Sequence, residues 1–176
     1  MRRIIAIALS ACLVLSMAGC GSNWTTIEAN GYSYEVDANW ENESQGYYFF
    51  SSGDGGYFSV SVTEYGSSEL ALSDYSLSDQ QRELARLFED SYYEAGNGDI
   101  LEWVYENVQT GMVGEHAMAS ATFTQYFNGE ASITGSQVVF FASSDLKVSI
   151  WFQCFPVDYE IYKPQFEHVI NSIKLV

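Results

Sequence analysis

Apolar and polar residues alternate along much of the chain with a period of two, the pattern of strands with one buried face. The clearest example is residues 57–65, where Phe58, Val60 and Val62 alternate with serine and threonine. The same reasoning predicts strands at residues 25–28, 32–36, 47–51, 57–65, 100–106, 119–124, 133–142 and 146–155.

Short glycine-containing segments separate these strands. Asn30-Gly31 predicts a tight hairpin between the first two, because both residue types tolerate a positive φ. Gly53-Asp54-Gly55-Gly56 predicts a second hairpin, and Asn128-Gly129 a further turn.

Two segments have the three-and-four spacing of amphipathic helices. The first begins at Ser78, which with Gln81 has capping-box spacing, and ends at Gly96. Its apolar stripe is Leu84, Leu87, Phe88, Tyr92 and Ala95. The second begins near Lys163-Pro164, since proline suits a first helical turn. Its stripe is Phe166, Val169, Ile170 and Ile173.

The strands at residues 133–142 and 146–155 are apolar on both faces, so they are expected at the centre of a sheet covered on both sides. The order of elements predicts an α+β fold. It is a mostly antiparallel sheet of about six to eight strands with helices on both faces, an α/β/α sandwich.

The first 20 residues resemble a bacterial lipoprotein leader. Arg2 and Arg3 precede an apolar run over residues 4–17, and Ala18-Gly19 stand before Cys20. Such a lipobox implies a signal peptide at 1–19, diacylation of Cys20, a tether at 20–24 and one domain at 25–176. The run is too short for a transmembrane helix. An ordinary secretory signal with a chance cysteine remains the alternative.

The chain is strongly acidic. Its formal charge is −16, and losing Arg2 and Arg3 with the leader would take it to −18. Such a balance excludes nucleic acid as a partner, because phosphates need a basic footprint. It also disfavours docking on an anionic bilayer by charge, so the membrane would be held through two acyl chains.

Catalytic chemistry has little support in the residues. With Cys12 in the leader and Cys20 acylated, Cys154 is left alone in an apolar strand, where a cysteine is usually a small core residue. His116 and His168 show no spacing that demands a shared metal, and no Gly-x-Ser-x-Gly elbow is present. We therefore predict no catalytic, metal or cofactor-binding residue.

The remaining acidic features have plain interpretations. Asp54 fits a hairpin turn, since its loop lacks the Lys of a phosphate loop and the repeated acids of a calcium loop. The paired acids are interpreted as solvated: Glu41 with Glu43, Asp74 with Asp79, and Glu89 with Asp90.

Tyrosine is abundant, with 13 residues. Those considered for a binding surface are Tyr47, Tyr48, Tyr57, Tyr65, Tyr92 and Tyr93. Together with Trp40 or Trp103 in a concave surface they would suit a sugar, a peptide or a partner protein. The favoured interpretation is that many lie at sheet edges with hydroxyls in water.

Several segments carry a family resemblance. They are the opening hairpin into Trp40, residues 47–50 with 58–62, the helix after residues 72–75, residues 114–117, and the ending at 166–174. From about Tyr32 onward the chain resembles the PsbP-like α/β/α sandwich, in particular small PsbP-related and DcrB-like bacterial lipoproteins. It lacks the proline those proteins often place before the position of Trp40. The resemblance implies a non-enzymatic binding or assembly-support role and transfers no functional residue.

These observations predict a lipoprotein held at the outer side of the bacterial cell membrane. It would act as a non-catalytic protein-binding or assembly-accessory module with an envelope protein partner. Binding of a small ligand or a divalent metal is the alternative. A hydrolase that uses His116 or His168 is a third, weaker one.

Overall fold

The computed structural model describes residues 23–42, 48–53, 56–66 and 75–176. The strands are β1 (Trp24–Glu28), β2 (Tyr32–Asp37), β3 (Glu41–Asn42), β4 (Tyr48–Gly53), β5 (Gly56–Gly66), β6 (Ser91–Glu94), β7 (Ile100–Val113), β8 (His116–Phe127), β9 (Glu130–Ser143), β10 (Leu146–Cys154) and β11 (Lys174–Leu175). The helices are α2 (Leu77–Ala85) and α3 (Tyr159–Ser172), with short 3₁₀ turns η2 (Arg86–Phe88) and η3 (Pro156–Asp158).

The strands form two sheets. The larger has eight strands in the order β3-β4-β5-β10-β9-β8-β7-β6, and the smaller has the order β1-β2-β11. All the strand pairs described are antiparallel. The doubly apolar strands β9 and β10 lie at the centre of the larger sheet, as the sequence predicts.

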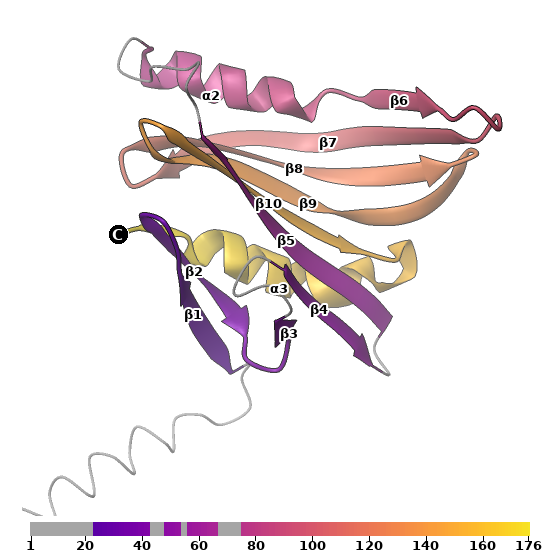
Figure 1. Ribbon diagram of the computed structural model, residues 1–176, viewed down its shortest axis with the longest axis horizontal. Coiled ribbons are helices and arrows are strands. Elements are labelled where there is room, and N and C mark those ends of the chain that lie inside the picture. Colours follow the sequence, from indigo (N-terminus) through magenta and orange to yellow (C-terminus); the bar gives the residue numbers. More distant parts are fainter. Residues whose placement is uncertain (1–22, 43–47, 54–55, 67–74) are drawn as a thin grey trace, which may run out of the picture.

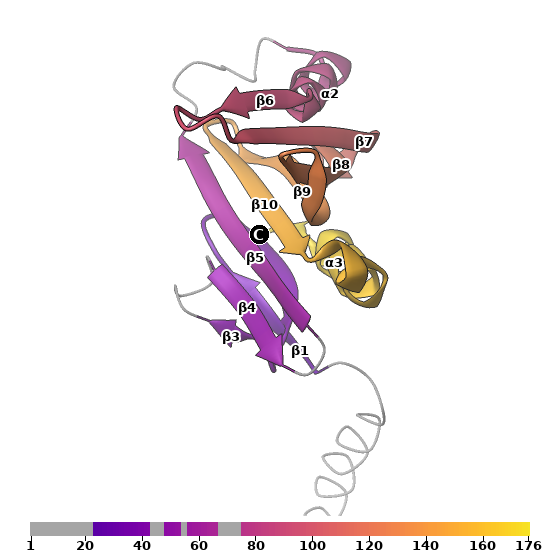
Figure 2. The same ribbon diagram turned by 90° about the vertical axis from the view of Figure 1, so that its right-hand side faces the viewer.

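Helices cover both faces of the larger sheet, which confirms the predicted α+β fold class. Helix α2 packs on β7 and β8, whereas α3 packs on β9 and β10 and is enclosed from the other side by β2. Figure 1 shows α2 above the sheet and α3 between the sheet and the β1-β2 hairpin. Figure 2 shows how strongly the strands twist from β4 to β6.

The core follows the alternation along the central strands. Val138 and Phe140 of β9 face α3 and join the main cluster around Phe166. Val139 and Phe141 of the same strand point the other way and pack with Leu84 of α2. Each face of β9 is therefore buried by its own helix.

The predicted hairpins are present. Strand β1 pairs with β2 across the Asn30-Gly31 turn, where Gly31 alone has a positive φ (82°). Strand β4 pairs with β5, although Asp54 at the turn lies outside the described residues. At the next predicted turn both Asn128 and Gly129 have a positive φ.

The first helix predicted from the sequence begins after the observed start of α2 and extends well past its observed end. Its N-cap is Ser76, whose hydroxyl oxygen accepts the Asp79 N–H, and α2 proper ends at Ala85. Tyr92 lies on strand β6, which pairs with β7. The β-forming Ser91-Tyr92-Tyr93 run gains a ladder with a long strand, and this pairing replaces further helical turns.

The last helix begins earlier than predicted. It starts at Tyr159, so Pro164 lies inside α3 instead of in its first turn. Tyr162 packs on Phe58 and Phe166, and these contacts hold the additional N-terminal turn against the core. The predicted stripe is confirmed: Phe166 and Val169 are fully buried.

Candidate functional site

The residues of the predicted lipid anchor lie outside the described part of the chain. Cys20 and the leader before it belong to residues 1–22, so their acylation stays a prediction. No helix within the described residues is both long and apolar enough to cross a bilayer.

The two histidines have separate surroundings. The His168 Nε2 atom lies 2.8 Å from Glu35 Oε2, and its ring stacks on Trp24. His116 begins strand β8 instead. Among the described residues no group of three His, Cys, Asp or Glu side chains is placed to hold a metal ion. His168 thus joins β1 and β2 to α3.

Cys154 is a core residue, as the sequence predicts. It is fully buried among the strands facing α3, and its thiol lies 3.7 Å from the Thr134 carbonyl oxygen. Burial raises the pKa of the thiol to about 12, and the nearby Asp158 carboxylate adds to the effect. A thiol with so high a pKa is a poor nucleophile at neutral pH.

Of the three acidic pairs, only Glu89 with Asp90 lies wholly within the described residues, while Asp79 is half-buried. Asp79 lies in the first turn of α2, where its carboxylate accepts a hydrogen bond from the Ser76 hydroxyl and pairs with Arg82. The Ser76 hydrogen bond is the main cause of a lowered pKa for the Asp79 carboxyl. Glu89 and Asp90 are exposed, whereas Glu43 and Asp74 lie outside the described residues.

The aromatic residues divide between core and surface. Trp40 is buried, which excludes it from the concave binding surface that was the less favoured alternative. Its ring packs on Phe58 in the core beneath α3. Tyr92 and Tyr93 of the edge strand β6 are 61% and 59% exposed, as the interpretation of wet sheet edges requires. Tyr47 lies outside the described residues, and the side chains of Tyr48 and Tyr57 are not described either.

One row of apolar side chains crosses three strands at the β6 end of the sheet. Tyr93 pairs with Leu101, and Leu101 pairs with Phe127. Residues directly opposite one another on paired strands project from the same face of the sheet. We call this set, two aromatic rings with a leucine between them, the aromatic row. Tyr93 and Phe127 are both exposed and Leu101 is half-buried. Sequence reasoning missed this row because its members become neighbours only through the strand register.

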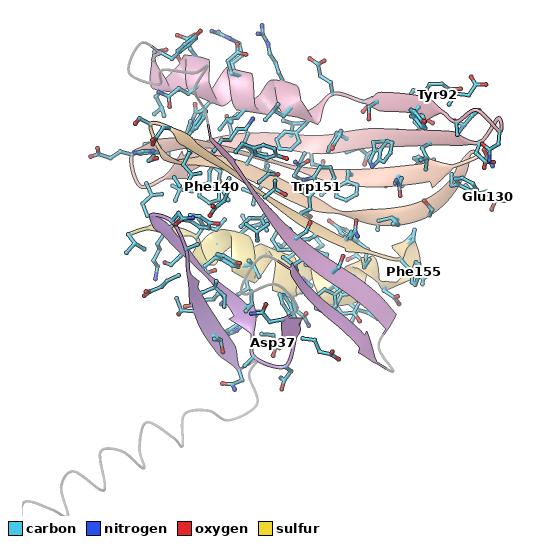
Figure 3. The ribbon with its side chains drawn as sticks, in the orientation of Figure 1. Asp37, Tyr92, Glu130, Phe140, Trp151 and Phe155 are labelled. Carbon is cyan, nitrogen blue, oxygen red and sulfur yellow. The ribbon has the colours of Figure 1, made fainter. Side chains whose placement is uncertain are left out.

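The surroundings of the aromatic row are acidic. Phe127 pairs with Glu130 of β9, which extends the row by one carboxylate, and Glu94 follows Tyr93. Figure 3 shows Tyr92 and Glu130 at the same end of the sheet. The chain has no Lys or Arg between Arg86 and Lys147, so strands β6, β7, β8 and β9 contribute none to this end of the sheet.

A groove lies between α3 and the strands β7, β8 and β9. It consists of two hollows of about 200 and 260 Å³. Both are lined by Asn107, Thr122, Tyr159 and Lys163, so they adjoin. We call this feature the α3 groove. Most of its other lining side chains carry hydroxyl, amide or carboxylate groups.

A β-bulge shapes the wall of the α3 groove. The β7–β8 register shifts between Glu106 and Gln109, and Asn107 has a positive φ of 54°. The Asn107 amide donates to the Thr122 hydroxyl (3.1 Å), which in turn donates to the Glu106 carbonyl (3.1 Å). Bulges redirect side chains and occur often beside binding sites. Here the bulge turns Asn107 toward α3.

Comparison with known proteins identifies the fold of the chain but not its function. No protein-family model matches the chain, and no curated protein matches it. The fold is PsbP-like: the solution structure of cyanobacterial PsbP (CyanoP) from Synechocystis sp. PCC 6803 superposes with a TM-score of 0.57. The match covers 90% of this chain and 96% of that chain at 13% sequence identity.

Proposed function

We propose that this protein is a lipid-anchored accessory module that binds another protein of the cell envelope through the aromatic row. The observation that carries the proposal is the exposed Tyr93-Leu101-Phe127 row on a rigid sheet. Exposed aromatic side chains are enriched where proteins meet, because they bury a large area at little conformational cost.

The charge around the row selects the chemistry of the partner. Glu130 extends the row on the same face, Glu94 is the next residue after Tyr93 on β6, and no Lys or Arg lies between Arg86 and Lys147. A partner face with apolar side chains rimmed by Lys or Arg is complementary to this arrangement. A second copy of this chain would bring like charges together, so self-association through the row is disfavoured.

The anchor places the module at the membrane surface. Acylation of Cys20 leaves only Gly21, Ser22 and Asn23 before strand β1 begins. A chain of that length keeps Trp24 within about 14 Å of the lipidated residue. The partner would then be a membrane protein or a protein held near the same surface.

A non-catalytic role accords with the chemistry of the described residues. Their one free cysteine, Cys154, is buried, and they contain no metal-binding cluster. His168 is engaged with Glu35 and Trp24. The likeness to a PsbP fold supports a binding scaffold of this kind.

Photo-crosslinking in intact cells tests the role of the aromatic row. A photoreactive residue at Ser91, which lies two positions before Tyr93 on β6 and so projects from the same face, is expected to capture one defined protein with a basic contact face. The Tyr93→Ser/Phe127→Ser variant should lose this product. The matched Val157→Ser/Ile161→Ser variant changes two exposed apolar residues on η3 and α3, 87% and 59% exposed, and should retain it. Equal capture by all three chains would contradict the proposal.

A further inference from the structure

We infer that the α3 groove is a binding site for a neutral saccharide, which goes beyond the partner surface described above. Each hollow alone is small for an organic ligand, but the two adjoining hollows together fall in the lower part of the usual range, about 300–1,000 Å³. An elongated ligand of a few linked sugar rings matches two hollows in series.

The hydrogen-bonding groups of the groove fit sugar hydroxyls. The amides of Asn107, Gln109 and Asn171 and the hydroxyls of Thr122 and Ser136 line it. Amides and hydroxyls donate and accept, as sugar hydroxyls do, so the two sets can pair in either direction. The side chains that line this groove are mostly polar in type, and they suit a ligand with many hydrogen-bonding groups.

Tyr159 supplies an apolar wall. It is common to both hollows, is half-buried, and has its hydroxyl 3.4 Å from Ser136 Oγ. An aromatic ring with one polar end can cover the C–H face of a sugar while its hydroxyl stays hydrogen-bonded. A ligand without an apolar face would gain no favourable contact area from this ring.

The charges of the groove favour a ligand without net charge. Lys163 lines both hollows, Glu167 lines the first, and Glu106 and Glu160 line the second. The three carboxylates disfavour an anion, and the Lys163 ammonium, common to both hollows, disfavours a cation bound beside it. A hydroxyl-rich neutral molecule can accept from Lys163 and donate to the carboxylates at the same time.

Lys163 is available for such a contact. Glu160 and Glu167 lie three and four positions away on α3, the spacing of helical ion pairs. Among the described residues, nevertheless, Lys163 takes part in none of the ion pairs. The two arginines of the described residues differ in this respect, because Arg82 pairs with Asp79 and Arg86 pairs with Glu83.

The bulge presents Asn107 to the groove at a conformational cost. Positive φ is uncommon for a residue other than glycine, and such positions cluster at binding sites. Glycine at position 107 would keep the backbone conformation and remove the amide. The chain also contains a matched position, Asn128, with a φ of 51° in the β8–β9 turn, outside the groove.

Calorimetric titration of the purified full chain tests the inference. The neutral probes are maltotetraose and N-acetylchitotetraose, and the competing classes are gluconate and tetra-alanine. One neutral sugar is expected to bind at a single site. Asn107→Gly and Lys163→Gln should each weaken that binding roughly tenfold, since each removes a hydrogen bond to the ligand.

Asn128→Gly is the control for backbone and stability. Asn128 accepts the Ile100 N–H and donates to Asp99, so its loss also removes two local hydrogen bonds. Saccharide affinity should be unchanged in this variant. The inference is overturned if neither sugar binds at millimolar concentration, or if gluconate or tetra-alanine binds more tightly. It is also overturned if the two groove variants weaken binding no more than Asn128→Gly does.

Discussion

The indole ring of Trp24 stacks on the imidazole of His168, with ring centroids 3.7 Å apart and planes 13° from parallel. Trp24 begins the first strand after the proposed anchor, and His168 lies in the last helix. The contact therefore joins the two ends of the described chain. The imidazole is also hydrogen-bonded to Glu35 of β2, so stacking and hydrogen bonding converge on one side chain.

Replacing Trp24 by alanine should destabilise the fold. The variant loses the stack on His168 and the edge contact with Trp40, whose ring centroid is 6.5 Å away. Two aromatic contacts and the area they bury contribute roughly 2–3 kcal/mol to the free energy of unfolding. Urea denaturation measures this change. Trp24→Phe keeps a stacking ring and should lose less than half as much, so equal losses would argue against the stack.

Two glycines inside strands should respond differently to alanine. A Cβ atom on Gly135 would lie 1.7 Å from the Phe152 carbonyl oxygen on the neighbouring strand, so the two strands must move apart. A Cβ on Gly111 meets only the terminal methyl of Met118 at 3.2 Å, which can rotate away.

Gly135→Ala should therefore cost about 3 kcal/mol or more in the free energy of unfolding, and Gly111→Ala less than about 1 kcal/mol. Thermal and urea denaturation of the two variants give the comparison. Near-equal midpoints would mean that β9 and β10 do not approach as closely as the structure has them.

Alkaline pH should weaken the fold through the buried thiol. The pKa of Cys154 is raised from 9.0 to about 12, mainly by burial, and that of Tyr105 from 10.0 to about 12. Between the unfolded and folded pKa values the folded state holds more protons than the unfolded state. Stability is therefore full below about pH 9 and declines as the pH rises toward 12.

Cys154→Ala separates the thiol from other alkaline effects. Between about pH 8 and pH 10.5 the variant should lose less stability than the parent chain, because one of the linked protons is gone. Denaturation midpoints at both pH values measure this difference. Parallel losses in the two chains would show that Cys154 ionises equally in both states.

The fold could be predicted from the sequence where one physical pattern dominates. The alternation along Phe58, Val60 and Val62 located β5, because a half-buried strand needs it. Helix limits were less predictable: Tyr92 continues a helical stripe in sequence, yet pairing with β7 places it on a strand. Local propensity yields to a long neighbouring strand there.

The two surface features depend on register, which the residues alone do not specify. Tyr93, Leu101 and Phe127 become one row only when β6, β7 and β8 align as they do. The sequence does contain a signal for the bulge beside the α3 groove. The alternation of apolar and polar positions falls out of step between Tyr105 and Val108, and such a break indicates one inserted residue in the strand.

Mass spectrometry of the mature N-terminus tests the central claim, that this PsbP-like domain is held at the membrane by a lipid on Cys20. Protein purified from membranes of a bacterium that expresses the full chain is expected to begin at Cys20 and to carry a diacylglyceryl group on the thiol. A Cys20→Ala chain should lack the lipid and leave the membrane fraction. An unmodified N-terminal peptide, or one that begins at another residue, would contradict the account.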